Sequence, residues 1–214
     1  MGIYAIGDIH GHSDKLDNLM ARLPLTAQDK LVFLGDYVDR GTDSKGVISL
    51  LIQIAKRYDT ICLLGNHDHM FVDYVRGCQT YDIGLWMAPQ NAGVTCLRSY
   101  GDPEAEPGQV AIPAEHREFL DKLHYYHVED GFVFVHGGLK PGVPLKDNKY
   151  KDFLWPRSAF YTSQYRWPEG RVVFGHTVFP EPLVEENKIG IDTNCARGGP
   201  LTAVRLPDVE FFQV

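Results

Sequence analysis

The stretch Gly35-Asp-Tyr-Val-Asp-Arg-Gly41 places two carboxylates and a guanidinium between two glycines. An apolar run at residues 31–34 precedes it, and a helical pattern of apolar residues follows it from residue 42 to 54. We therefore expect a loop where a buried strand ends and a helix begins. In α/β sheets such loops, at the carboxyl ends of the strands, are where ligands bind. Taken alone, the stretch is equally compatible with a solvated surface turn.

Two further segments repeat this order of apolar strand, polar loop and helical pattern. Residues 3–6 lead into Gly7-Asp-Ile-His-Gly11, and residues 60–64 lead into Gly65-Asn-His-Asp68. Three such units in succession predict βαβ crossovers and a parallel sheet. The three loops should therefore lie at one edge of that sheet.

Each of the two outer loops is ambiguous when it is taken alone. Asp8 and His10 lie two residues apart, so on an extended segment their side chains leave from the same face. Asn66 and Asp68 are also residue types that commonly start helices. Three neighbouring loops with oxygen or imidazole donors nevertheless indicate one shared site better than three unrelated turns.

Two apolar strands in the second half of the chain each end in a histidine. Residues 132–135 precede His136, and residues 171–174 precede Gly175-His176. Either histidine could be structural, but two such strands suggest that they complete the site. The tail segments 189–193, 201–206 and 209–214 partly alternate apolar and polar residues, so we expect edge or antiparallel strands there. Two sheets packed face to face, with helices outside, account for these segments.

The pattern changes between about residues 71 and 130, where helical turns and a Gly- and Pro-rich loop replace the strands. An amphipathic helix starts at Pro113. We expect a mostly helical lobe inserted into a single catalytic domain that spans residues 1–214. Its aromatic residues are more typical of a core than of a substrate platform, but Tyr81 or Trp86 could contact substrate if the lobe overhangs the site.

The composition excludes several classes of protein. Lys and Arg total 21 against 28 Asp and Glu, a net charge of −7, which argues against binding to nucleic acid. No apolar run reaches the roughly 18 residues of a membrane-spanning helix, and the N-terminus lacks the basic start of a signal peptide. The four cysteines are widely spaced and form no C-x-x-C motif. We expect reduced thiols in a cytoplasmic, monomeric protein with no membrane partner.

The loops at the strand ends supply six side chains of the kinds that hold divalent metal ions. Carboxylates, an amide and imidazoles without a thiolate suit manganese, iron or zinc. Six protein ligands are too many for one catalytic ion that keeps a position open, whereas they suit two ions that share the central Asp36. The candidate ligands are Asp8, His10, Asp36, Asn66, His136 and His176.

The remaining charged residues of these loops suit phosphoryl chemistry. Two metal ions about 3.5–4 Å apart can hold a hydroxide and stabilise an in-line displacement at phosphorus. The guanidinium of Arg40 would bind phosphate oxygens in a bidentate manner. His67 would protonate the leaving oxygen as a general acid, and Asp39 would hold its ring and favour the imidazolium form.

Five blocks carry a resemblance to a known family: Gly7-Asp-Ile-His-Gly11, Gly35-Asp-Tyr-Val-Asp-Arg-Gly41, Gly65-Asn-His-Asp68, His136-Gly-Gly138 and Gly175-His176. In this order they resemble the calcineurin-like metallophosphoesterases, specifically the phosphoprotein phosphatase family with its bacterial and phage members. The resemblance implies an α/β fold, a four-layer αββα sandwich, and a dinuclear centre that is often filled with manganese. It also implies direct attack by a metal-bridging hydroxide, without a phosphoenzyme intermediate.

The resemblance also implies roles for individual residues. His67 becomes the acid paired with Asp39, and Arg40 becomes a phosphate ligand, with Asn66 also beside the phosphate. The first metal ion is assigned to Asp8, His10 and Asp36, and the second to Asp36, Asn66, His136 and His176.

Two arginines are less certain in this comparison. The segment Leu154-Trp-Pro-Arg157 looks like the position of a second phosphate-binding arginine in bacterial members, although Arg157 could be an ordinary surface residue. Arg197 departs from the family pattern, because relatives often carry an aromatic residue at this place before two glycines. It either adds a cation at the rim of the site or is solvated.

Three functions remain open at this point. The first is a metal-dependent phosphomonoesterase acting on phosphoserine, phosphothreonine or phosphotyrosine in proteins. The second is a symmetrical bis(5'-nucleosyl)-tetraphosphatase, which hydrolyses diadenosine tetraphosphate with the same metal centre. The third is an inactive binding module, but it predicts losses among the ligands, and none is seen at the matched positions. We expect the first, with a phosphoprotein or a phosphorylated small molecule as substrate.

Overall fold

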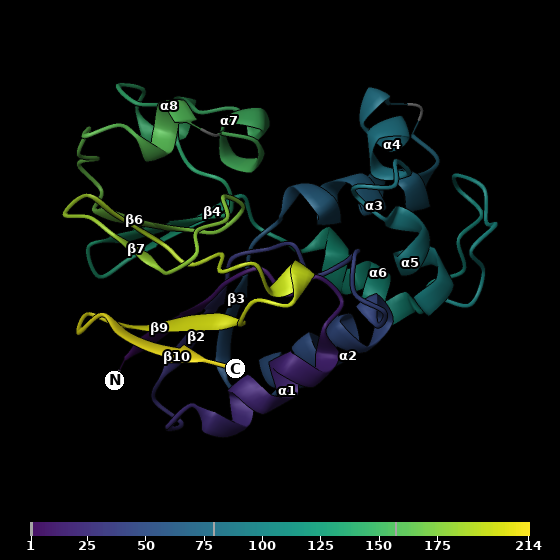
Figure 1. Ribbon diagram of the computed structural model, residues 1–214, viewed down its shortest axis with the longest axis horizontal. Helices are drawn as coiled ribbons and strands as arrows, with labels where there is room; N and C mark the ends of the chain where they lie inside the picture. The colour runs from purple at the N-terminus through teal and green to yellow at the C-terminus, as the bar shows by residue number, and fades with distance from the viewer. Residues whose placement is uncertain (1, 79, 157) are drawn as a thin grey trace.

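Two five-stranded sheets form the centre of the computed structural model, which describes residues 2–78, 80–156 and 158–214 (Figure 1). The first sheet contains β1 (Ile3–Ile6), β2 (Lys30–Phe33), β3 (Asp59–Cys62), β9 (Thr202–Leu206) and β10 (Glu210–Gln213), in the order β10-β9-β1-β2-β3. The second contains β4 (Tyr126–Glu129), β5 (Phe132–Val135), β6 (Arg171–Phe174), β7 (Leu183–Val184) and β8 (Lys188–Gly190), in the order β4-β5-β6-β8-β7. The helices are α1 (Ser13–Arg22), α2 (Ser44–Ala55), α3 (Asn66–Arg76), α4 (Tyr81–Trp86), α5 (Gly93–Ser99), α6 (Ala114–Asp121), α7 (Tyr150–Leu154) and α8 (Ser158–Tyr161).

The three strand–loop–helix units predicted for the first half of the chain are confirmed. Strand β1 runs parallel to β2, and β2 runs parallel to β3. Helix α2 starts where the sequence indicated, because the side chain of Asp43 accepts a hydrogen bond from the backbone N–H of Gly46 and caps its first turn. Strands β9 and β10 join the other side of β1 in antiparallel order, as the tail pattern predicted.

Strand β8 corrects the expectation of edge or antiparallel strands in the tail. It lies inside the second sheet and runs parallel to β6, which is itself parallel to β5. The two-residue strand β7 takes the edge position instead and pairs with β8 in antiparallel order. The carboxyl end of β8 therefore points to the same edge of the molecule as those of β5 and β6.

The alternation of side chains along the strands explains why the two sheets pack face to face. In β2, Val32 joins an apolar cluster between the sheets, whereas Leu31 and Phe33 face the helices. In β5, Phe134 faces the same inner cluster, and its two neighbours, Val133 and Val135, face outward. Both β2 and β5 therefore have apolar side chains on each face and are buried on each face, as their continuous apolar runs predict.

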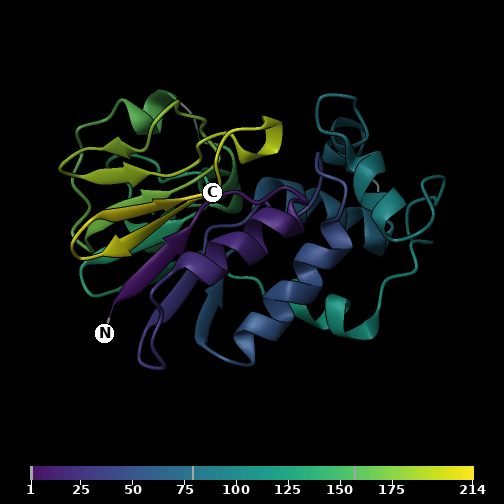
Figure 2. The ribbon, with the colours of Figure 1, turned by 60° about the horizontal axis from the view of Figure 1, so that its bottom comes forward.

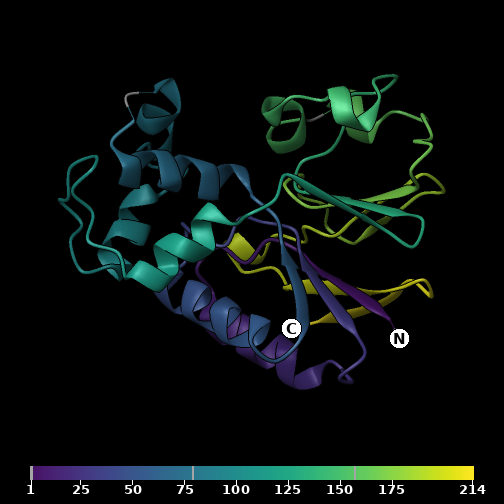
Figure 3. The same cartoon turned by 180° about the vertical axis from the view of Figure 1, so that it is seen from behind.

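Helices cover both outer faces, so the predicted four-layer αββα sandwich is confirmed. In Figure 1, α1 and α2 lie below the first sheet, and the short helices α7 and α8 lie above the second. Figure 2 brings α1 and α2 to the front. Helices α3 to α6 form a lobe beside the sheets, but the predicted limit of about residue 130 is too late, because residues 126–129 form β4 of the second sheet (Figure 3).

The described residues contain neither a candidate membrane-spanning helix nor a disulfide. None of the helices in the described ranges has both the length and the apolar character that a bilayer span requires. All four cysteines are free thiols, and Cys96 and Cys195 are buried in the core. The thiols of Cys96 and Cys195 therefore contribute to packing.

Candidate functional site

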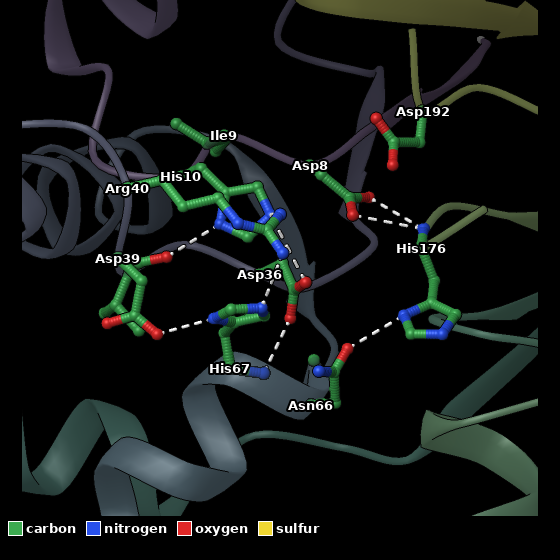
Figure 4. Close-up of polar contacts among 12 residues, drawn as sticks. Asp8, Ile9, His10, Asp36, Asp39, Arg40, Asn66, His67, His176 and Asp192 are labelled. Carbon is green, nitrogen blue, oxygen red and sulfur yellow. Dashed lines mark hydrogen bonds and ion pairs between the residues drawn. The ribbon is translucent and has the colours of Figure 1, made fainter. Parts of the chain in front are cut away.

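The carboxyl ends of the parallel strands in both sheets meet at one edge, where polar side chains point toward one another (Figure 4). The structure brings together every site residue predicted from the sequence except Arg157, which lies outside the described residues. They are Asp8 and His10 after β1, Asp36, Asp39 and Arg40 after β2, Asn66 and His67 after β3, His136 after β5 and His176 after β6.

The carboxylate of Asp68 fixes the two central loops of the site. It is fully buried and accepts hydrogen bonds from the backbone N–H groups of Asp36 (2.8 Å), Tyr37 (2.9 Å), Gly65 (3.0 Å) and Val38 (3.3 Å). Burial and the nearby charge of Asp36 raise the pKa of Asp68, whereas the N–H donors of Gly65 and Tyr37 lower it and stabilise the charged carboxylate. From the sequence this residue resembled an ordinary helix-start carboxylate, so its role was missed.

Two of the candidate metal-binding histidines are held in one orientation by hydrogen bonds to backbone carbonyl oxygens. The Nδ1 atom of His10 lies 2.9 Å from the carbonyl oxygen of Val38, and that of His136 lies 3.0 Å from the carbonyl oxygen of Leu34. A carbonyl oxygen can only accept, so each Nδ1 carries the proton. Burial lowers the pKa of both rings, so the Nε2 atom of each keeps a lone pair.

The lone pair on Nε2 of His136 faces two acceptor oxygens, an arrangement that a bound cation explains, whereas that of His10 faces a carboxylate oxygen and also the guanidinium of Arg40. The Nε2 atom of His136 lies 3.0 Å from Oδ1 of Asn66 and 3.4 Å from Oδ1 of Asp36. The Nε2 atom of His10 lies 3.4 Å from Oδ2 of Asp36. Because no proton is available between the ring, amide and carboxylate acceptors around His136, a positive ion between them would remove their repulsion. The residues present therefore fit divalent metal ions.

Asp36 belongs to both groups of possible metal ligands. Its carboxylate forms one group with His136 and His176 and another with His10 and His67, and in each group the donor atoms lie within 4.8 Å of one another. Although burial opposes it, the surrounding imidazoles, that of His136 foremost, hold the pKa of Asp36 well below its usual range. This shared position agrees with the bridging role expected from the sequence.

Asp8 and Asp192 add two more buried carboxylates to the site. Asp8 accepts the backbone N–H of His176 with both oxygens, at 3.1 and 3.2 Å, and so joins the two sheets. Burial and the neighbouring carboxylates of Asp192 and Asp36 raise the pKa of Asp8 well above its usual range. Three carboxylates gathered in a buried site are costly unless cations lie among them, so this crowding also fits a metal centre.

Asp192 was missed by the sequence analysis. It follows β8 in the same way that Asp36 follows β2, but its strand had been interpreted as an edge or antiparallel strand. Burial raises the pKa of Asp192 to about 6. The signal was present in residues 189–192, a short apolar run that ends in an aspartate.

His67 is held by a carboxylate on the side away from the cavity. Its Nδ1 atom lies 2.6 Å from Oδ2 of Asp39, and both side chains are buried. Although burial lowers it, the carboxylates of Asp36 and Asp39 raise the pKa of His67 above its usual value. A proton on Nδ1 and a raised pKa suit a proton donor better than a metal ligand, although His67 lies near His10 and Asp36.

Trp86 donates a hydrogen bond to the same oxygen of Asp39, with its Nε1 atom 2.6 Å away. The indole is fully buried, so it belongs to the core and does not contact substrate. The side chain of Tyr81, the other aromatic residue considered for substrate contact, lies outside the described residues. The link from the helical lobe to Asp39 was not foreseen, because nothing in the local sequence pairs the two residues.

Arg40 lies in front of the two imidazoles at the mouth of the site (Figure 4). Its Nη1 atom is 2.7 Å from Nε2 of His10, and its Nη2 atom is 3.0 Å from Nε2 of His67. The guanidinium is the cation closest to the place where phosphate oxygens would meet these rings. A planar fork in this position can bind two oxygens of one phosphate.

The loops reach this geometry through backbone conformations that few residues adopt. Five site residues without the freedom of glycine have positive φ angles: His10 (48°), Asp36 (53°), Asp39 (72°), Arg40 (65°) and His176 (61°). The flanking glycines contribute as expected, since Gly35 has a φ of 102° and a side chain at Gly41 would lie 2.3 Å from the carbonyl oxygen of His10.

An open cavity of about 500 Å³ lies above the site. The aromatic ring of Trp155 lines it next to His176, with 6.1 Å between the ring centres. Asn91 of the helical lobe and Asn194 and Arg197 of the loop between β8 and β9 form other parts of the wall. A cavity of this size accepts a molecule larger than a simple phosphate.

Known proteins resemble this chain along most of its length. A family model described as calcineurin-like phosphoesterase matches residues 1–202. The asymmetrical bis(5'-nucleosyl)-tetraphosphatase PrpE of Oceanobacillus iheyensis is 27% identical over 239 residues, which cover 100% of this chain and 92% of that protein. The protein of the same name from Halalkalibacterium halodurans is 26% identical and is matched over 98% of this chain and 92% of its own length.

Similar solved structures share the fold over the whole chain. One, described as a candidate diadenosine tetraphosphatase, has a TM-score of 0.76 at 24% identity and is matched over 100% of this chain and 92% of its own. The cold-active protein-tyrosine phosphatase of a psychrophile Shewanella species has a TM-score of 0.64 at 18% identity, with coverage of 99% and 80%. At these identities the likeness shows a common fold and no more.

Replacing Asp68 by asparagine tests whether one carboxylate holds the central loops. In Asp68→Asn the new amide group can donate but no longer offers two acceptor oxygens to four backbone N–H groups. We expect the free energy of unfolding in urea to fall by at least about 2 kcal/mol, since a buried donor without an acceptor costs roughly 1–3 kcal/mol. The control Asp17→Asn, on the exposed face of α1, should stay within about 0.5 kcal/mol of the parent. Equal stabilities for the two variants would contradict this role.

Proposed function

The chain belongs to the calcineurin-like phosphoesterases, and from this premise we propose that it hydrolyses dinucleoside tetraphosphates asymmetrically. The observation that carries the phosphoester chemistry is the carboxylate of Asp36, which is shared by two groups of metal-type ligands beneath a cavity of about 500 Å³. The nucleotide substrate is supported by relatives of that name that align with this chain almost from end to end.

This proposal reverses the order of the two hydrolase functions considered from the sequence. A protein phosphatase was expected first and a symmetrical tetraphosphatase second, whereas the relatives favour the nucleotide substrate and asymmetrical cleavage. The similar protein-tyrosine phosphatase supports only the shared fold. An inactive binding module is disfavoured, because all the matched ligand and acid residues are present in the part of the chain that the structure describes.

We propose that two divalent ions, manganese rather than iron or zinc, bind at this site. Bound ions would activate a water molecule and offset the charge of the phosphoryl oxygens. Asp36 would hold both ions. The remaining ligands would be Asp8 and His10 on one side and Asn66, His136 and His176 on the other.

The other residues of the site position the substrate and move a proton. Arg40 would bind two oxygens of the phosphate that is attacked, with the amide of Asn66 beside it. His67 would give the proton on Nε2 to the leaving oxygen, while Asp39, bonded to Nδ1, fixes the ring and stabilises its cationic form. Arg40 then has to turn from the imidazoles toward the phosphate, which frees Nε2 of His67.

The leaving group decides how much the proton from His67 matters. Asymmetrical cleavage of a tetraphosphate releases a nucleoside triphosphate and a monophosphate, so a phosphate oxygen leaves. Such an oxygen has a pKa near 6, far below that of an alcohol, so it departs with less need of a proton. We therefore expect His67 to be less important for the dinucleotide than for esters of poorly acidic alcohols or phenols.

The proposed function is tested by identifying the products of the manganese-loaded protein. We expect diadenosine tetraphosphate to give ATP and AMP in equal amounts, separated by anion-exchange chromatography, with a kcat/KM at least about tenfold above that for phosphoserine and phosphotyrosine peptides. Two molecules of ADP would instead support symmetrical cleavage. Rapid release of phosphate from the peptides, with the dinucleotide left intact, would sink the proposal in favour of a protein phosphatase.

The shared position of Asp36 is tested by counting metal ions. Asp36→Asn keeps the oxygen that accepts the backbone N–H of His67, at 2.9 Å, but removes the negative charge between the two ligand groups. We expect the manganese content after loading and desalting to fall from about two ions per chain to fewer than one, because both ions lose a ligand. Asp17→Asn should retain the parent content. Loss of only one ion in Asp36→Asn would show that the carboxylate does not bridge.

A further inference from the structure

Arg197 lies on the wall of the same cavity as Arg40, at the end of the 3₁₀ turn Cys195–Arg197 between β8 and β9. Its side chain is exposed, and no carboxylate in the described ranges forms an ion pair with it. The charge of Arg197 is therefore available to a molecule in the cavity.

The loop that carries Arg197 is anchored on both sides of the turn. The backbone N–H of Asn194 donates to Oδ1 of Asp192 at 3.0 Å, and Oγ1 of Thr193 donates to the carbonyl oxygen of Pro200 at 2.8 Å. The Nζ atom of Lys15 donates to the carbonyl oxygen of Gly199 at 2.6 Å. Binding of a ligand to Arg197 therefore costs little conformational entropy of the backbone, because the loop is already fixed.

The charges are laid out along the cavity for a chain of phosphates. Asp36, Asn66 and His176, with the ions they would hold, line the cavity, and Arg40 lines it beside the imidazole of His10. A phosphomonoester has a single phosphate. A dinucleoside tetraphosphate carries a negative charge on every phosphate, so the phosphates next to the one that is attacked are also anionic.

We propose that Arg197 binds the phosphate chain beyond the phosphate that is attacked and makes the site selective for polyphosphates over monoesters. This inference rests on the proposed function. A guanidinium suits this task, because it stays charged and can bind two phosphate oxygens at once. The residue that departs from the family pattern is then the one that recognises the substrate class.

The test compares Arg197→Ala and Arg197→Lys on diadenosine tetraphosphate and on 4-nitrophenyl phosphate. We expect the alanine variant to lose roughly 10- to 100-fold in kcat/KM on the dinucleotide, mainly through KM, and less than about twofold on the aryl phosphate. The lysine variant should lie between alanine and the parent. Arg98→Ala, an exposed arginine of α5, is the matched control and should change neither reaction.

A second readout keeps this inference separate from the proposed function. Inorganic tripolyphosphate should inhibit hydrolysis of 4-nitrophenyl phosphate, and its inhibition constant should rise about tenfold or more in Arg197→Ala but not in Arg98→Ala. This result would support polyphosphate binding at Arg197 even if the parent did not cleave the dinucleotide. An unchanged inhibition constant, or equal losses on both substrates, would overturn the role of Arg197.

A different observation, the buried bond between Trp86 and Asp39, carries a second inference. Oδ2 of Asp39 accepts from both Nε1 of Trp86 and Nδ1 of His67, each at 2.6 Å. The other oxygen of Asp39 has no hydrogen-bond partner among the described residues. The ring of Trp86 is held in turn by Tyr74, with 4.7 Å between the ring centres, and by Phe71, at 5.8 Å.

We infer that Trp86 is a positioning residue for the general acid proposed above. With both donors on one oxygen, the carboxylate of Asp39 has a fixed direction, and the ring of His67 takes its orientation from it. General acid catalysis requires the donor to lie within hydrogen-bond reach of the leaving oxygen, so a ring that can swing loses efficiency. The helical lobe would thus contribute to catalysis through the orientation of His67.

The test uses Trp86→Phe on phenyl phosphate and 4-nitrophenyl phosphate, because phenol is a much poorer leaving group than 4-nitrophenol. We expect kcat to fall roughly fivefold to 20-fold on phenyl phosphate and less than about twofold on 4-nitrophenyl phosphate. The ratio of the two rates is measured on one preparation, so a partly unfolded sample does not affect it. The matched control is Trp167→Phe, which changes another buried tryptophan, packed in the apolar cluster outside the second sheet.

A double variant decides whether Trp86 acts through His67. In the background of His67→Asn, which lacks the acid, Trp86→Phe should change the ratio of the two rates by less than about twofold, because the path through His67 is already lost. An unaltered ratio in the single variant would overturn the inference. The same ratio change with and without His67 would overturn it as well, since Trp86 would then act elsewhere.

Discussion

The site depends on the buried bonds from Asp68 to the backbone of two loops. Its carboxylate accepts N–H groups from the loop that follows β2 and from the start of α3. The backbone N–H of Asp36 is one of these groups. The side chain of Asp36 in turn accepts a hydrogen bond from the backbone N–H of His67. The possible metal bridge and the possible acid therefore take their places from one carboxylate that touches neither substrate nor metal.

The same polar contacts also hold the two sheets together at this edge. The ring of His136, from the second sheet, bonds to the carbonyl oxygen of Leu34 in the first, and the N–H of His176 bonds to Asp8. Farther from the edge, an apolar cluster fills the space between the sheets. The ligand residues therefore serve as structural contacts as well, and their geometry changes if one sheet slides against the other.

Local patterns explain which parts could be predicted from the sequence. The first three strands, α1 and α2, and the ligands at the strand ends follow from apolar periodicity and from donors placed directly after it. Asp192 and Trp86 escaped because their roles depend on contacts between distant segments: the parallel pairing of β8 with β6, and the burial of α4 against the loop of Asp39. The apolar residues before Asp192 indicate a strand but not its partner, and nothing near Trp86 indicates its contact with Asp39.

The positive φ angles of His10, Asp36, Asp39, Arg40 and His176 set stability against activity. Glycine would relax the backbone at each position, and each strained residue costs the fold about 1–3 kcal/mol. Laboratory evolution for heat resistance alone would therefore favour glycine at the positions where the chemistry needs a side chain. A search for stabilised variants therefore has to measure turnover as well, because relief of this backbone strain removes side chains that the chemistry needs.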